Sequence, residues 1–125
     1  MKTLALTTGL QTLTAAGAVA DPLDISAIAR PATLTLTVAK LTSATTTTPR
    51  ARVVIEDSID AFAHSLPVAM INIEGPINTP NTFTWNADHI PSCRIGNTGA
   101  VLRVNVVALE GSTPSITLEA EMQNG

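Results

Sequence analysis

The chain of 125 residues has little aromatic content and almost no cysteine. It contains no tyrosine, one tryptophan, two phenylalanines and a single cysteine, Cys93. One cysteine cannot form an internal disulfide, so the fold must rest on side-chain packing. Surfaces that stack bases use exposed aromatic rings, and adhesive loops are rich in tyrosine. The sequence therefore disfavours both of these binding classes.

Charge is also scarce. Charged residues make up 14% of the chain, against about 25% in typical domains. The chain has seven Lys and Arg residues and ten Asp and Glu residues, which gives a formal charge of −3. Binding to nucleic acid needs a basic patch, so no nucleic-acid partner is expected. The chain also lacks an apolar run of about 18 residues, so no transmembrane helix and no membrane partner are expected. Threonine is abundant instead, with 19 copies.

The clearest pattern is strict alternation over residues 33–42. Leu34, Leu36 and Val38 point to one side, and three threonines point to the other. This period of two predicts a half-buried β-strand, and threonine suits its outer face because its side chain is β-branched.

Further strands are predicted between turn signals. In the segment 100–110, we expect Leu102, Val104, Val106 and Ala108 to point inward. In the last strand, Ile116, Leu118, Ala120 and Met122 should point inward, and Thr117, Glu119 and Glu121 outward. Turns are expected at residues 57–60 and, with the length of a hairpin turn, at residues 111–114. The predicted strands are 33–42, 50–56, 68–74, 83–85, 100–110 and 115–122.

Short strands at this spacing, each with one apolar face, are typical of two sheets packed together. We therefore predict an all-β fold, an antiparallel β-sandwich that is either Ig-like or jelly-roll-like. Residues 32–125 would form the sandwich domain. Residues 1–31 would form an extended N-terminal arm, in which residues 23–28 could be a short strand or a helical turn.

The arm is the predicted interaction site, either on its own body or on a neighbour. Leu4, Leu6, Leu10 and Leu13 would contact the neighbouring molecule. An alternative is a signal peptide, because Lys2 precedes an apolar stretch that ends in Ala18-Val19-Ala20. Threonines interrupt that stretch repeatedly, which favours the arm. The alternative predicts a secreted binding module cleaved after Ala20.

Candidate catalytic and metal residues are few, and none forms a known pattern. Asp88, His89 and Cys93 could hold a metal only with help from the distant His64, and structural zinc needs four ligands. Glu56, Asp57 and Asp60 lack the ligand series of a calcium loop. Ser58 and Ser65 lie near His64 in sequence, but this proximity does not make a triad. We therefore expect no catalytic residue, no cofactor and no metal.

Four segments resemble a family. Residues 17–26 lead into an alternating strand, residues 53–62 end in Asp57-Ser58-Ile59-Asp60, and Phe83-Thr84-Trp85 precedes the strand Leu102-Arg103-Val104. Together they resemble the small β-sandwich virion proteins of tailed bacteriophages, over about residues 17–108.

This resemblance implies a structural role without catalysis. It suggests a capsid decoration (cement) protein on the outside of the virion. Its partners would be the major capsid protein and copies of itself, with a trimer as the expected assembly. A tail or head–tail connector component is the alternative within the same class.

Overall fold

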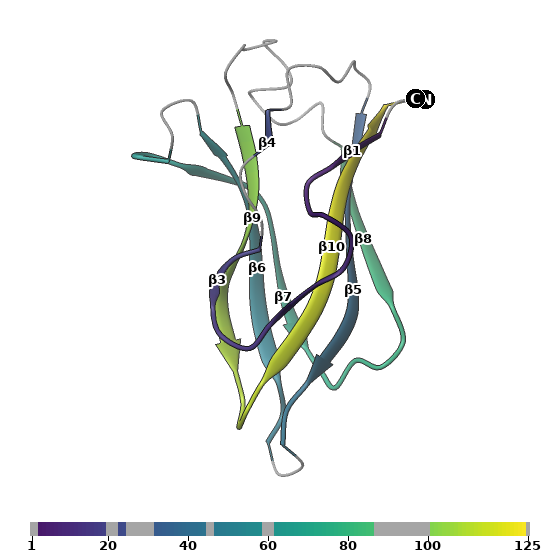
Figure 1. The fold of residues 1–125 in the computed structure, drawn as a ribbon, viewed down its shortest axis with the longest axis vertical. Coiled ribbons are helices and arrows are strands. Elements are labelled where there is room, and N and C mark those ends of the chain that lie inside the picture. Colours follow the sequence, from purple (N-terminus) through teal and green to yellow (C-terminus); the bar gives the residue numbers. More distant parts are fainter. Residues whose placement is uncertain are drawn as a thin grey trace.

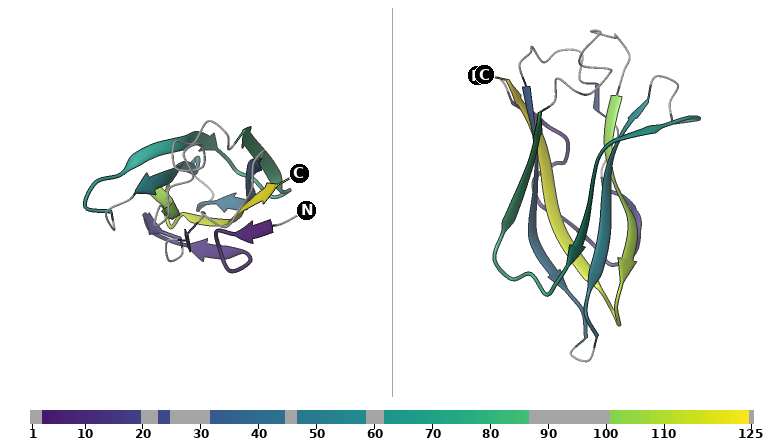
Figure 2. Two further views of the ribbon diagram at one scale, coloured as in Figure 1. Left: turned by 90° about the horizontal axis from the view of Figure 1, so that it is seen from above. Right: turned by 180° about the vertical axis from the view of Figure 1, so that it is seen from behind.

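Two antiparallel sheets packed face to face make up the computed structural model (Figures 1 and 2). It describes residues 3–19, 23–24, 32–44, 47–58, 62–86 and 101–124. The predicted all-β sandwich is confirmed. Its strands are β1 (Thr3–Ala5), β2 (Gln11–Leu13), β3 (Gly17–Ala18), β4 (Leu23–Asp24), β5 (Ala32–Thr42), β6 (Arg50–Ser58), β7 (Leu66–Glu74), β8 (Asn81–Asn86), β9 (Val101–Glu110) and β10 (Ser115–Asn124).

The strand order decides between the two predicted kinds of sandwich. One sheet, here sheet A, has the order β1-β10-β5-β8, and β2 also pairs with β10. The other, sheet B, has the order β3-β9-β6-β7, and β4 also pairs with β9. With β1 and β2 taken as one interrupted strand, and β3 and β4 as another, each sheet has four strands. This interleaved order is the eight-stranded connectivity of a jelly roll.

The core lies between the sheets and is built from the alternating apolar positions. Leu34, Leu36 and Val38 on β5 are fully buried, as the pattern predicts. They face the inward residues of β6 and β9, which include Val53, Ile55, Leu102, Val104 and Val106. The four predicted inward residues of β10 are also buried: Ile116, Leu118, Ala120 and Met122. Each large side chain of this kind contributes about 1.5–3 kcal/mol through burial.

A bulge in β9 corrects the predicted face of Ala108. Val53 pairs with Val106, whereas Arg52 pairs with Ala108, so Val107 is an extra residue in the ladder. Two residues of β9 therefore oppose Arg52, which places Val107 and Ala108 on the outer face together. Leu109 takes the inward position and packs against the core.

Two predicted turns are also corrected. Asp57 and Ser58 continue β6 instead of leaving it, and both are buried. The segment 111–114 is not a hairpin turn, because β9 belongs to sheet B and β10 to sheet A. It crosses from one sheet to the other, as Figure 1 shows at the lower end of the sandwich.

The described part of the predicted arm lies on the body of its own chain. Strands β1 and β2 run along β10, with Leu4 opposite Met122 and Thr12 opposite Thr117. The chain then crosses to sheet B, where β3 and β4 run along β9. Residues 3–19 and 23–24 thus supply the first two strands of the jelly roll. Contact of this segment with a neighbouring molecule stays a prediction.

Candidate interaction surfaces

The four leucines predicted to contact a neighbour lie in different environments. Leu6 is 3% exposed and belongs to the core, whereas Leu10 is 53% exposed. Leu4 and Leu13 are partly buried and pack against the core. This corrects the prediction for Leu6, because a side chain enclosed by its own core cannot reach a partner. Leu10 is the member of the set that offers its apolar surface to solvent.

Thr7 explains how Leu6 is held in place. The hydroxyl of Thr7 accepts a hydrogen bond from the Ala120 N–H, with Oγ1 to N at 3.2 Å, and donates one to the Gly9 carbonyl at 2.9 Å. The N–H groups of Leu6 and Thr7 both donate to the Ala120 carbonyl. The segment between β1 and β2 is therefore hydrogen-bonded to β10 although it is not part of a β-strand pairing with it.

All three aromatic side chains of the sequence lie among the described residues. Phe83 and Trp85 sit on β8 opposite Leu36 and Leu34 and pack against the core, so the prediction that they share one face is confirmed. The Phe62 ring lies under the Arg103 guanidinium, with 4.1 Å from Cζ to the ring centroid. Each aromatic ring thus contacts other residues of the same chain, and the surface offers no row of exposed rings on which a ligand could stack.

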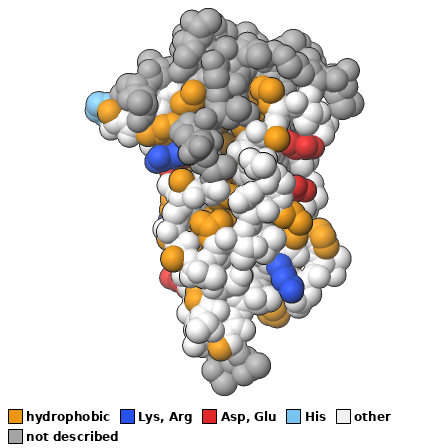
Figure 3. Space-filling model, in the orientation of Figure 1, with side chains coloured by type: hydrophobic (Ala, Val, Ile, Leu, Met, Phe, Trp, Pro, Cys, Tyr) orange, Lys and Arg blue, Asp and Glu red, His pale blue; other side chains and the backbone are white. Residues whose placement is uncertain are grey.

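Polar residues cover the outer face of sheet A. The hydroxyl groups of Thr12 and Thr117 lie 2.9 Å apart, and those of Thr37 and Thr82 lie 3.3 Å apart across neighbouring strands. Glu119 and Glu121 lie on the same face, opposite Thr37 and Thr35. The two carboxylates border a shallow depression that is also lined by Ala5, Thr7 and Gly9. In the view of Figure 3, charged side chains are sparse among uncharged surface.

A polar cluster sits on the outer face of sheet B, where β6 and β9 pair. Arg103 forms an ion pair with Glu56, with Nη2 to Oε2 at 2.9 Å. Asn105 donates to the other carboxylate oxygen, with Nδ2 to Oε1 at 3.0 Å. Glu56 is only 8% exposed, and both of its oxygens have partners. The polar side chains of this cluster therefore satisfy one another.

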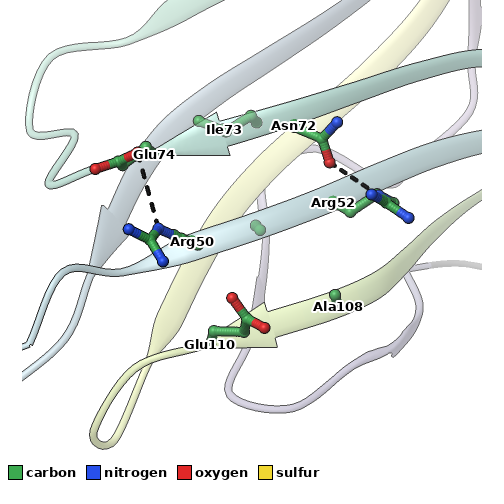
Figure 4. A pocket seen from close by; sticks show the side chains of 8 residues that line it. Arg50, Arg52, Asn72, Ile73, Glu74, Ala108 and Glu110 are labelled. Atoms are coloured by element: carbon green, nitrogen blue, oxygen red, sulfur yellow. Dashed lines mark hydrogen bonds and ion pairs between the residues drawn. The ribbon is translucent and has the colours of Figure 1, made fainter.

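A second group of charged residues on sheet B lines a groove of roughly 380 Å³. Arg50 lies opposite Glu74 on β7 and Glu110 on β9, with 3.8 Å from its Nε to Glu74 Oε2. Arg52 has Asn72 on one side and Ala108 on the other (Figure 4). Its Nε donates to Asn72 Oδ1 at 2.8 Å, and among the described residues no carboxylate pairs with it. The sequence alone did not reveal this groove, because the bulge at Val107 shapes the strand that borders it.

The free edge of sheet B is long and apolar. Among the described strands, β7 pairs with β6 alone, and from Leu66 to Ile73 it carries no charged residue. Leu66 and Met70 are 62% and 54% exposed. Exposed edge strands usually carry lysine or another device that prevents pairing with other chains. In β7 such devices are confined to its start, where Pro67 is followed by a bulge at Val68.

No metal site forms within the described part of the chain. No group of three or more His, Cys, Asp or Glu side chains comes together there. His64 is exposed, and its carbonyl accepts a hydrogen bond from the Ser58 hydroxyl at 2.8 Å. Asp60, Asp88, His89 and Cys93 lie outside the described residues. Over the same described ranges, no helix is long and apolar enough to cross a membrane.

Comparison with known proteins gives no relative. The chain matches no family model, no curated protein and no solved structure.

Proposed function

We propose that this chain is a structural virion protein of a tailed bacteriophage, a capsid decoration protein that binds the outside of the assembled shell. It would bind the major capsid protein and copies of itself. The sandwich and the resemblance of residues 17–108 to such proteins are the starting points. Its action would be mechanical, through contacts that exist only on the assembled shell.

The jelly-roll connectivity is the observation that carries this proposal. Jelly rolls serve as viral capsid domains, as lectins and as metal-binding cupins. Within the described residues no three metal-binding side chains come together, so nothing there points to a cupin, and Asp88, His89 and Cys93 lie outside those residues. Phe83 and Trp85 pack inward, which removes support for a sugar-stacking lectin. Assembly is the use of this fold that the remaining surface favours.

The apolar edge of β7 gives independent support. A long apolar edge strand with exposed Leu66 and Met70 is a liability for a protein that remains alone at high concentration. In a subunit of a closed assembly, the same edge can be covered by a neighbour. A decoration protein that binds the shell, and not free capsid subunits, stabilises the shell by mass action.

Copy number per particle tests the location. Quantitative mass spectrometry of purified particles should find this chain in amounts comparable to the major capsid protein. A few copies, matching the symmetry of the tail or its junction, would point to a tail or connector component instead. Complete absence from particles, with a mature N-terminus created by cleavage after Ala20, would favour a secreted module and overturn the proposal.

Shell binding tests the mechanism. Purified protein should sediment with assembled shells that lack it and should raise their thermal stability. It should not bind unassembled capsid subunits under the same conditions. Equal binding to both forms would contradict the proposal, because contacts already present on free subunits cannot select the assembled state.

A further inference from the structure

We propose that the outer face of sheet B around Arg52 is a docking surface for a second copy of this chain, which contributes Leu10 and Glu119 from its sheet A. This inference rests on the part of the proposed function in which copies of the chain associate. It names the two surfaces that meet.

The bulge in β9 builds the apolar part of this docking surface. It places Val107, which is 42% exposed, beside Ala108 on the outer face opposite Arg52. Met70, which is 54% exposed, lies on β7 opposite Val54, one outward position along the strand from Asn72. Bulges often serve to redirect a side chain in this way. The result is an arginine flanked by exposed methionine and valine.

Arg52 is held in place without being neutralised. The hydrogen bond from its Nε to Asn72 Oδ1 fixes one edge of the guanidinium. The other arginines described on this face differ, because Arg50 faces Glu74 and Arg103 is paired with Glu56. Arginine and methionine are enriched in protein interfaces, and a fixed guanidinium loses less entropy on binding a carboxylate. The surface therefore fits a partner that offers a carboxylate beside an apolar side chain.

Sheet A of the same chain offers that combination. Glu119 lies on its outer face opposite Thr37, and it forms no hydrogen bond or ion pair with any described residue, Lys40 included. Leu10 directly follows Gly9, which lines the same depression as Glu119, and directly precedes Gln11, which pairs with Leu118. It is 53% exposed. An uncompensated carboxylate and an exposed leucine thus lie together on this side.

The two surfaces belong to opposite sheets, so the contact is heterologous. Each copy would use its sheet B surface on one neighbour and its sheet A surface on the other. Such contacts build a closed ring when the rotation between copies permits closure. This pairing accounts for Leu10, Met70 and Val107, which are three of the four large hydrophobic side chains exposed among the described residues. Edge-to-edge pairing of β7 would leave Leu10 and Glu119 uncovered.

Charge reversal tests the pairing. Self-association of the full chain is measured by sedimentation equilibrium at low salt, for the unaltered protein and for Arg52→Glu and Glu119→Arg. Each single variant should weaken association by about tenfold or more, because it places like charges face to face. The double variant should regain association.

Several outcomes would overturn the inference. A chain that stays monomeric up to millimolar concentration has no such contact. Weakening by Arg52→Glu alone, with Glu119→Arg neutral, means that Arg52 meets a part of the second copy other than Glu119. Weakening by both without recovery in the double variant excludes a direct contact. Circular dichroism confirms that each variant is folded. Failure here would leave shell binding by a monomer intact, so it is distinguishable from failure of the proposed function.

Discussion

The Arg103 guanidinium on β9 contacts one carboxylate oxygen of Glu56 on the neighbouring strand β6 through two nitrogens, with Nη2 to Oε2 at 2.9 Å and Nε to Oε2 at 3.0 Å. The side chains are 27% and 10% exposed, so this ion pair lies largely out of water on the outer face of a sheet. Asn105 occupies the second carboxylate oxygen. The outer face of sheet B is therefore partly a packed layer, and its charged residues divide into a structural pair and a solvent-facing group.

Arg103→Met should destabilise the protein by about 2–4 kcal/mol, because the Glu56 carboxylate loses its cation in a mostly buried position. Urea unfolding followed by Trp85 fluorescence measures this change. Arg50→Met is the matched control, because the Arg50 and Glu74 side chains are 60% and 64% exposed and 3.8 Å apart. The control should change stability by less than about 1 kcal/mol. Equal effects of the two substitutions would contradict a structural role specific to Arg103.

Leu6→Ala should cost about 2–4 kcal/mol, because it leaves a cavity beneath the segment that joins β1 and β2. Leu10→Ala, at an exposed position four residues later, should change the stability of the isolated chain by about 0.5 kcal/mol or less. Thermal unfolding of dilute samples compares the two. A small loss for Leu6→Ala would show that residues 3–19 do not pack on their own body in solution.

Thr7→Val should cost about 1–3 kcal/mol, because the buried Ala120 N–H loses the oxygen that it donates to. Thr12→Val is the control, since Thr12 is exposed and water can replace its contact with Thr117. Hydrogen exchange provides the specific readout, because the Ala120 amide should exchange faster in Thr7→Val and unchanged in Thr12→Val. Protection of Ala120 in both variants would refute this role of the hydroxyl.

Gly111→Ala should destabilise the protein more than Gly9→Ala does. Gly111 has a φ of +133°, and an added Cβ would lie 2.9 Å from Cβ of Ser43. Gly9 has a φ of +66° but open space around the position of a Cβ. Both changes place a side chain in the left-handed region, at a cost of about 1 kcal/mol or more, and only the first adds a steric clash. Chemical unfolding of the two variants side by side measures the difference.

Contact between Arg52 of one copy and Glu119 of another should make self-association sensitive to salt. If these two side chains meet, raising the ionic strength from about 0.01 M to 1 M shortens the screening length roughly tenfold and should weaken the complex. The Arg52→Met variant should lose most of this dependence. Association that strengthens steadily with salt would instead identify an interface dominated by apolar surface.

The sequence alone determined the six strands that follow residue 31 and, for most of them, which side chains face inward. Alternation in residues 33–42 and 115–122 fixes both, because successive side chains in a strand point to opposite faces. The placement of Phe83 and Trp85 on one face followed from the same rule. The sequence did not determine the short strands within residues 1–31. The low charge and the small number of aromatic residues by themselves argue against nucleic-acid binding and stacking surfaces.

Only the tertiary structure showed which strands pair with one another. Alternation says that a strand has an apolar face and does not say which strand lies beside it, so the jelly-roll order could not be read from residues 111–114 or from residues 1–31. Nothing in the sequence around Val107 marks the bulge, which arises from the mismatch between two paired strands and turns Ala108 outward. The burial of Leu6 and Glu56 likewise depends on neighbours that lie about 50 to 110 residues away in the chain, Arg103 and Ala120 among them. The local sequence pattern shows to which face of its strand a side chain points. Pairing between distant strands determines which other residues that side chain contacts.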